Sequence, residues 1–284
     1  MQRLRSEKTG VSYTSTGEAD APLVVCLHGF PDIPRTWDPL TDVLTRSGFR
    51  VIAPWLPGYA PSSLDGPLDL PAVTRRMLAF IDELSPNAPV RLVGHDWGAF
   101  IAHAALSQRP ERFRAAAILS IPHPLVLEDN ISKFPRQLLR SSYIAFFQLL
   151  AVPERVIRAR DFAFIEWLWK IWSPGFDPGP EYFDELKQCL RESMPAPLAY
   201  YRSLRSPKII RELRALLQID PIPVPTLYLH GERCGCVGVE LIGGQERYFS
   251  ALFETVRLAE AGHFLHLERP TEVNEAIQNW FLAH

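Results

Sequence analysis

The sequence has no uninterrupted apolar run of about 18 residues, the length that a membrane-spanning helix requires. Its first residues, Met1 to Ser6, have no apolar stretch of the kind found in secretory signals. An excess of charge is also absent, because 30 Lys and Arg are balanced by 32 Asp and Glu, for a net charge of −2. These absences argue against a membrane span and against nucleic acid or an anionic membrane as a partner. They predict a soluble, cytoplasmic protein. Nothing in the sequence specifies an oligomeric state.

Cysteine is scarce, with 4 in 284 residues at positions too scattered for a disulfide framework. Cys26 lies in an expected core strand, where a buried free thiol is the ordinary case. Cys234 and Cys236 form a C-x-C pair that lacks the third and fourth ligands of a structural zinc site. The sequence therefore predicts no disulfide framework and no structural metal.

Short apolar segments alternate with helical ones along much of the chain. Alternating polarity over residues 4–16 predicts an N-terminal hairpin. Further strands are expected at 23–27, 49–53, 90–93, 115–119, 226–229 and 255–258, and helices at 37–45, 71–84, 99–108 and 270–281. Short apolar strands separated by helices are typical of a mostly parallel sheet covered on both faces. The sequence thus predicts an α/β protein with one main domain and an insertion.

The alternation stops at Ile121-Pro122-His123-Pro124. From there to about Arg214 the pattern is helical, interrupted by prolines and rich in aromatic residues, most densely at 162–172. This helical region is expected to form a cap over the main domain. Most of its aromatic rings are expected to pack in the protein interior, and a few to line an apolar pocket between the cap and the main domain. The predicted organisation is a first core segment, a helical cap and a second core segment, at residues 1–122, 123–214 and 215–284.

The run Gly94-His95-Asp96-Trp97-Gly98 joins an expected strand to an expected helix. It has the spacing of the nucleophile elbow, Gly-x-Ser-x-Gly, with aspartate in place of serine. The two glycines are expected to let the chain turn sharply and present Asp96 in a cleft. A serine needs a base before it can attack, whereas an aspartate with an ordinary pKa of about 3.9 is already ionised at neutral pH. Asp96 can therefore attack saturated carbon and form an ester with the substrate.

Two further strand-to-loop junctions accompany the elbow: His28-Gly29-Phe30-Pro31 precedes it, and Ala261-Gly262-His263 lies near the C-terminus. In this order of motifs the chain resembles the α/β-hydrolase fold, and within it the epoxide hydrolases, over essentially its whole length. The resemblance implies a mostly parallel sheet flanked by helices, with an inserted helical cap. It also implies a small-molecule epoxide and water as reactants, and neither metal nor cofactor.

The resemblance implies a base and an oxyanion hole. His263 matches the family's catalytic histidine, which activates the water that hydrolyses the ester. The backbone N–H groups of Phe30 and Trp97 are expected to stabilise the oxyanion formed in that step. The remaining histidines near the motifs gain less support, and His95 is expected to point away from the cleft.

The leaving group sets the next requirement. An epoxide leaves as an alkoxide, which needs a proton donor, and a tyrosine suits this role. Tyr143 and Tyr201 resemble the two cap tyrosines of epoxide hydrolases, and Tyr200 would replace Tyr201 if the register were shifted by one residue.

One position departs from the family. The acid that orients the catalytic histidine is expected in Gly231-Glu232-Arg233-Cys234-Gly235, where Cys234 takes its place. A neutral thiol is a poor acceptor, and replacing such an acid in a serine protease costs about 10⁴ in turnover. Glu232 could reach His263 by another route. An acid could instead follow the strand that ends at Leu119, where Ser120 stands and Glu128 and Asp129 come later. The favoured interpretation is that ester hydrolysis is impaired.

Two other functions remain open at this stage. A haloalkane dehalogenase also uses an aspartate at the elbow, but it expels a halide that needs no proton, and Phe30 replaces its usual asparagine. A non-catalytic ligand-binding protein on the same scaffold is favoured by Cys234 alone. Retention of Asp96, His263 and both cap tyrosines argues against it.

Overall fold

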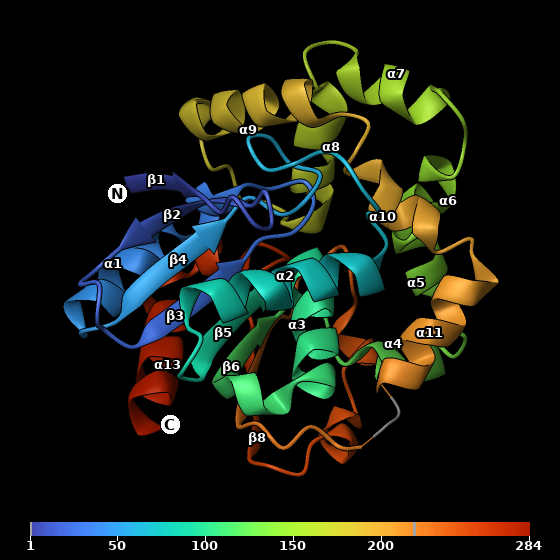
Figure 1. Ribbon diagram of the computed structural model, residues 1–284. Coiled ribbons are helices and arrows are strands. Elements are labelled where there is room, and N and C mark those ends of the chain that lie inside the picture. Colours follow the sequence, from blue (N-terminus) through green and yellow to red (C-terminus); the bar gives the residue numbers. More distant parts are fainter. Residues whose placement is uncertain (1, 218–219) are drawn as a thin grey trace.

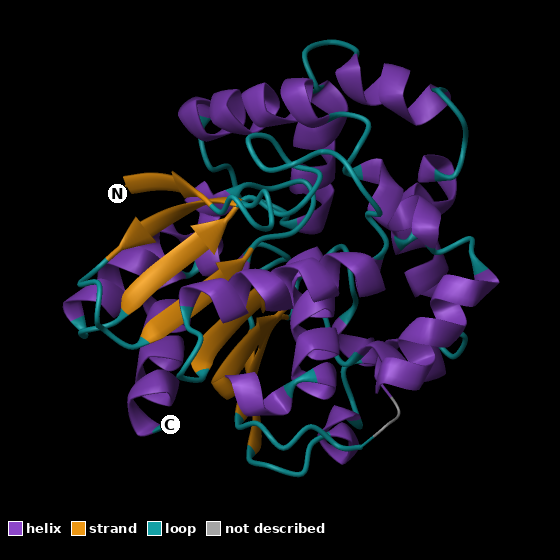
Figure 2. Cartoon of the chain, in the orientation of Figure 1, coloured by secondary structure: helices purple, strands orange, loops and turns teal. Residues whose placement is uncertain are grey.

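A computed structural model describes residues 2–217 and 220–284 of the chain, as one sheet surrounded by helices (Figures 1 and 2). The sheet has eight strands in the order β1-β2-β4-β3-β5-β6-β7-β8. Strands β1 and β2 form the predicted antiparallel hairpin, and β2 pairs antiparallel with β4, while β3 to β8 run parallel. The strand bounds are β1 Gln2–Arg5, β2 Ser12–Thr16, β3 Leu23–Leu27, β4 Arg50–Pro54, β5 Val90–His95, β6 Phe113–Leu119, β7 Thr226–Gly231 and β8 Phe253–Leu258.

Helices cover both faces of the sheet. Helices α2 (Leu70–Leu84) and α3 (Trp97–Gln108) pack on one face, and α1 (Asp38–Arg46) and α13 (Pro270–Ala283) on the other. Strand β3 is buried along its whole length, as expected of a central parallel strand. The start of α2 is set by Asp69, whose carboxylate accepts the Ala72 N–H at 2.9 Å. The predicted fold class, an α/β hydrolase fold, is confirmed.

A helical region is inserted between β6 and β7, and no strand interrupts it within the described residues. Its helices are α4 Pro124–Ile131, α5 Pro135–Arg140, α6 Ser142–Phe147, α7 Val152–Arg158, α8 Ala163–Trp172, α9 Pro180–Ser193, α10 Leu198–Ser203 and α11 Pro207–Leu217. They extend over the edge of the sheet where the parallel strands have their C-terminal ends (Figures 1 and 2). Helix α11 also packs against α2 and α3. The predicted inserted helical region is therefore confirmed, whereas its proposed bounds, residues 123–214, stay a prediction, and α11 runs to Leu217.

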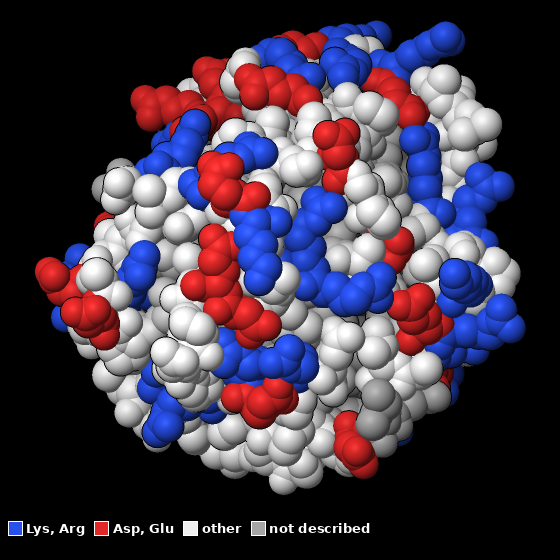
Figure 3. All heavy atoms as spheres, viewed as in Figure 1, with Lys and Arg blue, Asp and Glu red and all other residues white. Residues whose placement is uncertain are grey.

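Charged side chains of both signs alternate over the face shown in Figure 3, without a large area of one sign. Among the described residues, no helix is both long enough and apolar enough to cross a bilayer. The mixture of charges on this face agrees with the net charge of −2.

Candidate active site

Asp96 lies at the turn between β5 and α3. Its φ of 51° and ψ of −118° are values that residues other than glycine rarely adopt. The expectation that the flanking glycines provide the turn needs correction, because neither has a positive φ. A Cβ atom on Gly98 would collide with the carbonyl of Leu27, and one on Gly94 with the carbonyl of Gly98. The glycines therefore permit close packing of β3, β5 and α3, and the strained conformation belongs to the aspartate itself.

Two groups hold the carboxylate of Asp96. The backbone N–H of Phe30 donates a hydrogen bond to Oδ1 at 2.8 Å. Nε2 of His263 lies 3.5 Å from Oδ2, within ion-pair distance. Burial would raise the pKa of Asp96, which is only 3% exposed, but His263 and the Phe30 donor outweigh burial and lower it. Asp96 is therefore an anion at neutral pH.

His263 lies between Asp96 and Cys234. Its Nδ1 atom is 3.4 Å from Sγ of Cys234, and the same sulfur accepts the Val237 N–H at 3.4 Å. Burial lowers the pKa of His263, but Cys234 and Asp96 act against burial, and the net pKa is raised above the usual 6.5. In the resting site the imidazole is thus protonated and forms an ion pair with Asp96.

The alternative acids are engaged elsewhere. They form ion pairs with arginines, namely Glu232 with Arg257, Glu128 with Arg214 and Asp129 with Arg247. Ser120, at the end of β6, donates its hydroxyl to the carbonyl of His263 at 2.7 Å and so holds the main chain. Among the described residues, Cys234 is the hydrogen-bonding neighbour of His263 Nδ1, and none of these carboxylates reaches the ring.

A cavity of about 120 Å³ lies over Asp96, between the inserted helices and the sheet. Its wall is mainly apolar, and its aliphatic and phenylalanine members are Leu70, Phe100, Ile121, Leu127, Ile131, Ile144, Leu204, Leu213 and Val237. Trp97 lines the same cavity. Cavities of this kind contain few polar groups, and those few determine how a bound ligand is oriented.

The two predicted tyrosines, Tyr143 and Tyr201, both line this cavity. Tyr201 Oη has no hydrogen-bond partner among the described residues, whereas the neighbouring Tyr200 donates to the Pro57 carbonyl at 2.6 Å. Tyr201, the tyrosine of the chosen register, is thus the one that lines the cavity, and its role as a proton donor stays a prediction. Burial raises the pKa values of Tyr143 and Tyr201 well above 10, so both phenols keep their protons at neutral pH.

Sequence reasoning missed Cys236, which also lines the cavity. Its Sγ atom lies 3.5 Å from Tyr143 Oη. The loop is fixed by Gln137, whose amide nitrogen donates to the Cys236 carbonyl at 2.7 Å and whose amide oxygen accepts the Gly238 N–H at 3.0 Å. Burial raises the pKa of Cys236 well above its usual range, so the free thiol is neutral. Its spacing of two residues from Cys234 is the one signal that the sequence offers.

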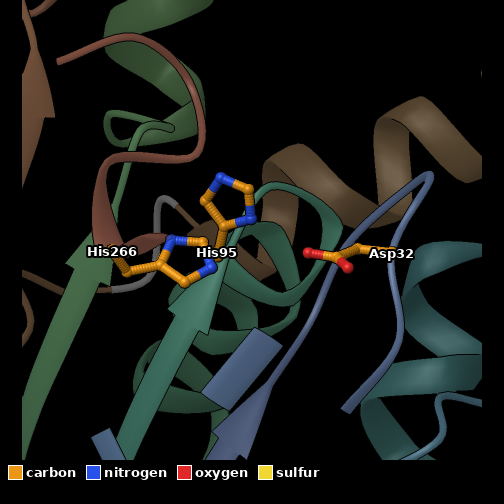
Figure 4. Close-up of side chains that lie close together, drawn as sticks. All are labelled: Asp32, His95 and His266. Atoms are coloured by element: carbon orange, nitrogen blue, oxygen red, sulfur yellow. The ribbon is translucent and has the colours of Figure 1, made fainter. Parts of the chain in front are cut away.

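Asp32, His95 and His266 form a second buried polar cluster (Figure 4). His95 Nε2 is hydrogen-bonded to the His263 carbonyl at 2.9 Å, and His266 Nε2 to Thr36 Oγ1 at 2.5 Å. None of the three is among the described residues that line the cavity. The prediction that His95 points away from the cleft is confirmed, and the cluster supports the loop that carries His263.

Residues 24–276 match the family model of the alpha/beta hydrolase family. The match covers far more than half of the chain and agrees with the sheet order and the inserted helices. The chain therefore belongs to the alpha/beta hydrolase family.

Within this family the chain is similar to epoxide hydrolases. It is 29% identical to Epoxide hydrolase 4 of Homo sapiens, over 97% of this chain and 76% of the relative. AB hydrolase superfamily protein YfhM of Bacillus subtilis is 28% identical, over 93% of this chain and 91% of the relative. The crystal structure of a Bacillus megaterium epoxide hydrolase in complex with an inhibitor has a TM-score of 0.82 and 25% identity, and the match covers 99% of both chains. The resemblance found in the motifs is confirmed.

Proposed function

We propose that this protein hydrolyses an apolar epoxide to a vicinal diol through an ester on Asp96. The observation that carries the proposal is the position of the Asp96 carboxylate, which lines the cavity together with two protonated phenols. Because Oδ1 accepts the Phe30 N–H, Oδ2 is the oxygen left to attack a ring carbon. The carbon–oxygen bond of the epoxide breaks, and Tyr143 and Tyr201 stabilise and protonate the alkoxide.

Hydrolysis of the ester then uses His263 as base. Formation of the ester removes the negative charge of Asp96, one of the groups that keep the pKa of His263 raised. Burial, which lowers that pKa, remains, and so does Cys234, which raises it. Alkylation therefore lowers the pKa of His263, and the proton that the imidazole releases replaces the one that the tyrosines gave to the alkoxide. The neutral imidazole then takes a proton from water as the water attacks the ester carbonyl. The N–H groups of Phe30 and Trp97 stabilise the resulting oxyanion, and its collapse releases the diol and restores the carboxylate.

Cys234 is proposed to slow this second step. An aspartate at this position would accept the Nδ1–H of His263 and stabilise the imidazolium that forms. A sulfur at 3.4 Å from Nδ1 makes a weaker hydrogen bond than a carboxylate oxygen would. Ring opening does not require this group, because Asp96 is already ionised. The covalent ester is therefore expected to accumulate during turnover.

The substrate is proposed to be apolar and bulky. The apolar wall of the cavity supports the first property, and the many aromatic residues of the inserted helices suggest the second. A series of terminal epoxides that carry alkyl or aryl groups of increasing size tests this proposal. Specificity constants that fall steadily with size would argue against a bulky substrate.

The two tyrosines favour an epoxide over a haloalkane. A halide leaves without protonation, so two phenols beside Asp96 would serve no leaving group in a dehalogenase. Parallel incubations with an aromatic epoxide and with a brominated alkane separate the two functions. We expect diol from the epoxide and no bromide from the haloalkane. Bromide release, or ligand binding without any adduct on Asp96, would support the dehalogenase or the non-catalytic alternative, respectively.

A further inference from the structure

We propose that Asp96, His263 and Cys236 form a binding site for one thiophilic divalent cation of the zinc class, and that this cation inhibits the enzyme. Each side chain offers one ligand atom, and these three atoms lie within 4.8 Å of one another. All three residues are buried. Carboxylate, imidazole and thiolate are the three ligand types that zinc accepts in proteins.

One of the three ligand separations already fits a tetrahedral ion, and the two that involve Cys236 Sγ lie within 4.8 Å. Ligand atoms bound to zinc at its usual distances lie roughly 3.3–3.6 Å apart. The separation between His263 Nε2 and Asp96 Oδ2 is already 3.5 Å. Nε2 has no hydrogen-bond partner among the described residues, and its contact with Asp96 is an ion pair that a cation could replace once the ring loses its proton. Asp96 and Cys236 line the cavity, which leaves a fourth position for water.

The surrounding contacts already orient the three ligands. Phe30 donates to Oδ1 of Asp96, and Cys234 contacts Nδ1 of His263, so that Oδ2 and Nε2 face each other in their ion pair. Such outer contacts fix the ligands of metal sites. Cys234 approaches the opposite side of the imidazole and cannot share the ion on Nε2. On binding, Cys236 would release its thiol proton and His263 its Nε2 proton to solvent.

The consequence for activity rests on the proposed function. A cation on Oδ2 and Nε2 occupies both the attacking oxygen and the base, so it would block ring opening and ester hydrolysis together. The chain's C-x-C pair then has two separate roles, with Cys234 on the histidine and Cys236 on the ion.

Cobalt binding tests the site without reference to activity. The reduced, chelator-treated full chain is titrated anaerobically with Co²⁺, and Zn²⁺ is then added in competition. We expect one ion per chain, a thiolate-to-cobalt charge-transfer band and the visible bands of a four-coordinate ion, all lost on adding zinc. Absence of a saturable band at one equivalent overturns the proposal.

Variants assign the ligands. Cys236→Ser is expected to lose the charge-transfer band and at least about 100-fold in affinity, since even supporting residues of metal sites cost 10–100-fold. Asp96→Asn should weaken binding without abolishing the band. Cys189→Ser is the matched control, because that buried thiol donates to the Ala60 carbonyl, away from the site. If Cys236→Ser does not fold, Cys236→Val provides the same test. A band that persists without the Cys236 sulfur, or that disappears in Cys234→Ser, overturns the assignment.

Inhibition is measured separately, as diol formation with and without Zn²⁺. We expect zinc to inhibit the parent and the Cys189→Ser variant, a chelator to reverse the inhibition, and Cys236→Ser to need at least about 10-fold more zinc. Turnover of an epoxide without a cobalt band would refute the metal site and leave the proposed function intact. A cobalt band in a protein that forms no diol refutes the proposed function alone.

Discussion

The sulfur of Cys234 lies 3.4 Å from Nδ1 of His263, on the side of the imidazole opposite to Asp96. A thiol therefore stands where a histidine of this kind ordinarily has a carboxylate partner. The main chain that carries the ring is still held in place, because Ser120 and His95 both bind the His263 carbonyl. The presence of Cys234 in place of a carboxylate therefore changes the electrostatic environment of His263 more than the position of its main chain.

The first prediction concerns Cys234→Asp. A carboxylate would stabilise the imidazolium formed during ester hydrolysis, so turnover should rise by about 10-fold to 10⁴-fold. The upper figure is the cost of losing such an acid in a serine protease. Quenched-flow mass spectrometry should show less alkylated enzyme at steady state. Cys234→Ala, which offers no acceptor, should be no faster than the parent. Equal turnover of parent and Cys234→Asp, with no adduct in either, would refute the impairment.

A second prediction separates adjacent tyrosines. Tyr143→Phe and Tyr201→Phe each remove a donor to the leaving alkoxide and should slow ring opening by about 10²- to 10³-fold. Tyr200→Phe loses only its bond to the Pro57 carbonyl and should change the rate little. Single-turnover formation of the ester measures this step directly. Equal effects of Tyr200→Phe and Tyr201→Phe would mean that Tyr201 acts through packing.

The third prediction is a pH dependence of stability. Asp96 has a lowered pKa, so its contribution is present above its ordinary pKa of 3.8 and is lost as pH falls through the lowered value. His263 has a raised pKa, so its contribution is present below 6.5 and is lost as pH rises through the raised value. The free energy of unfolding of the parent, relative to that of Asp96→Asn, should therefore decrease as pH rises above 6.5. Urea unfolding at several pH values measures it, and a difference that stays constant would contradict the ion pair.

A fourth prediction concerns the packing at the elbow. Gly98→Ala places a methyl group against the carbonyls of Leu27 and His28, and should destabilise the protein by about 1–3 kcal/mol. Gly243→Ala is the control, because nothing lies within 4 Å of the added Cβ and its φ is not positive. Thermal unfolding of both variants makes the comparison. Unchanged stability of Gly98→Ala would show that β3 and α3 can separate without cost.

Much of this site could be predicted because its residues follow the C-terminal ends of the parallel strands β3, β5, β7 and β8. The C-terminal ends of parallel strands meet at one edge of the sheet, so Phe30, Asp96, Cys234 and His263 were bound to converge once the strands were identified. The tyrosines were harder, since they lie on helices whose register no strand fixes. Their prediction depended on the resemblance to epoxide hydrolases.

Other features depend on packing that no local pattern encodes. The position of Cys236 is set by Gln137, about a hundred residues earlier in the chain, which binds the main chain on both sides of Val237. The role of Gly94 and Gly98 follows from the distance between β3 and α3, not from their own backbone angles. Contacts of this kind become visible only when the two partners are placed together.

Isotope transfer tests the central claim most directly. A single turnover with excess enzyme in heavy-oxygen water should place the label on the Asp96 carboxylate and leave the first diol unlabelled, because the diol takes its new oxygen from the enzyme. Asp96→Ala should form no diol and take up no label. Label found directly in the first diol, with none in the Asp96 peptide, would show that water opens the ring itself and would contradict the covalent mechanism.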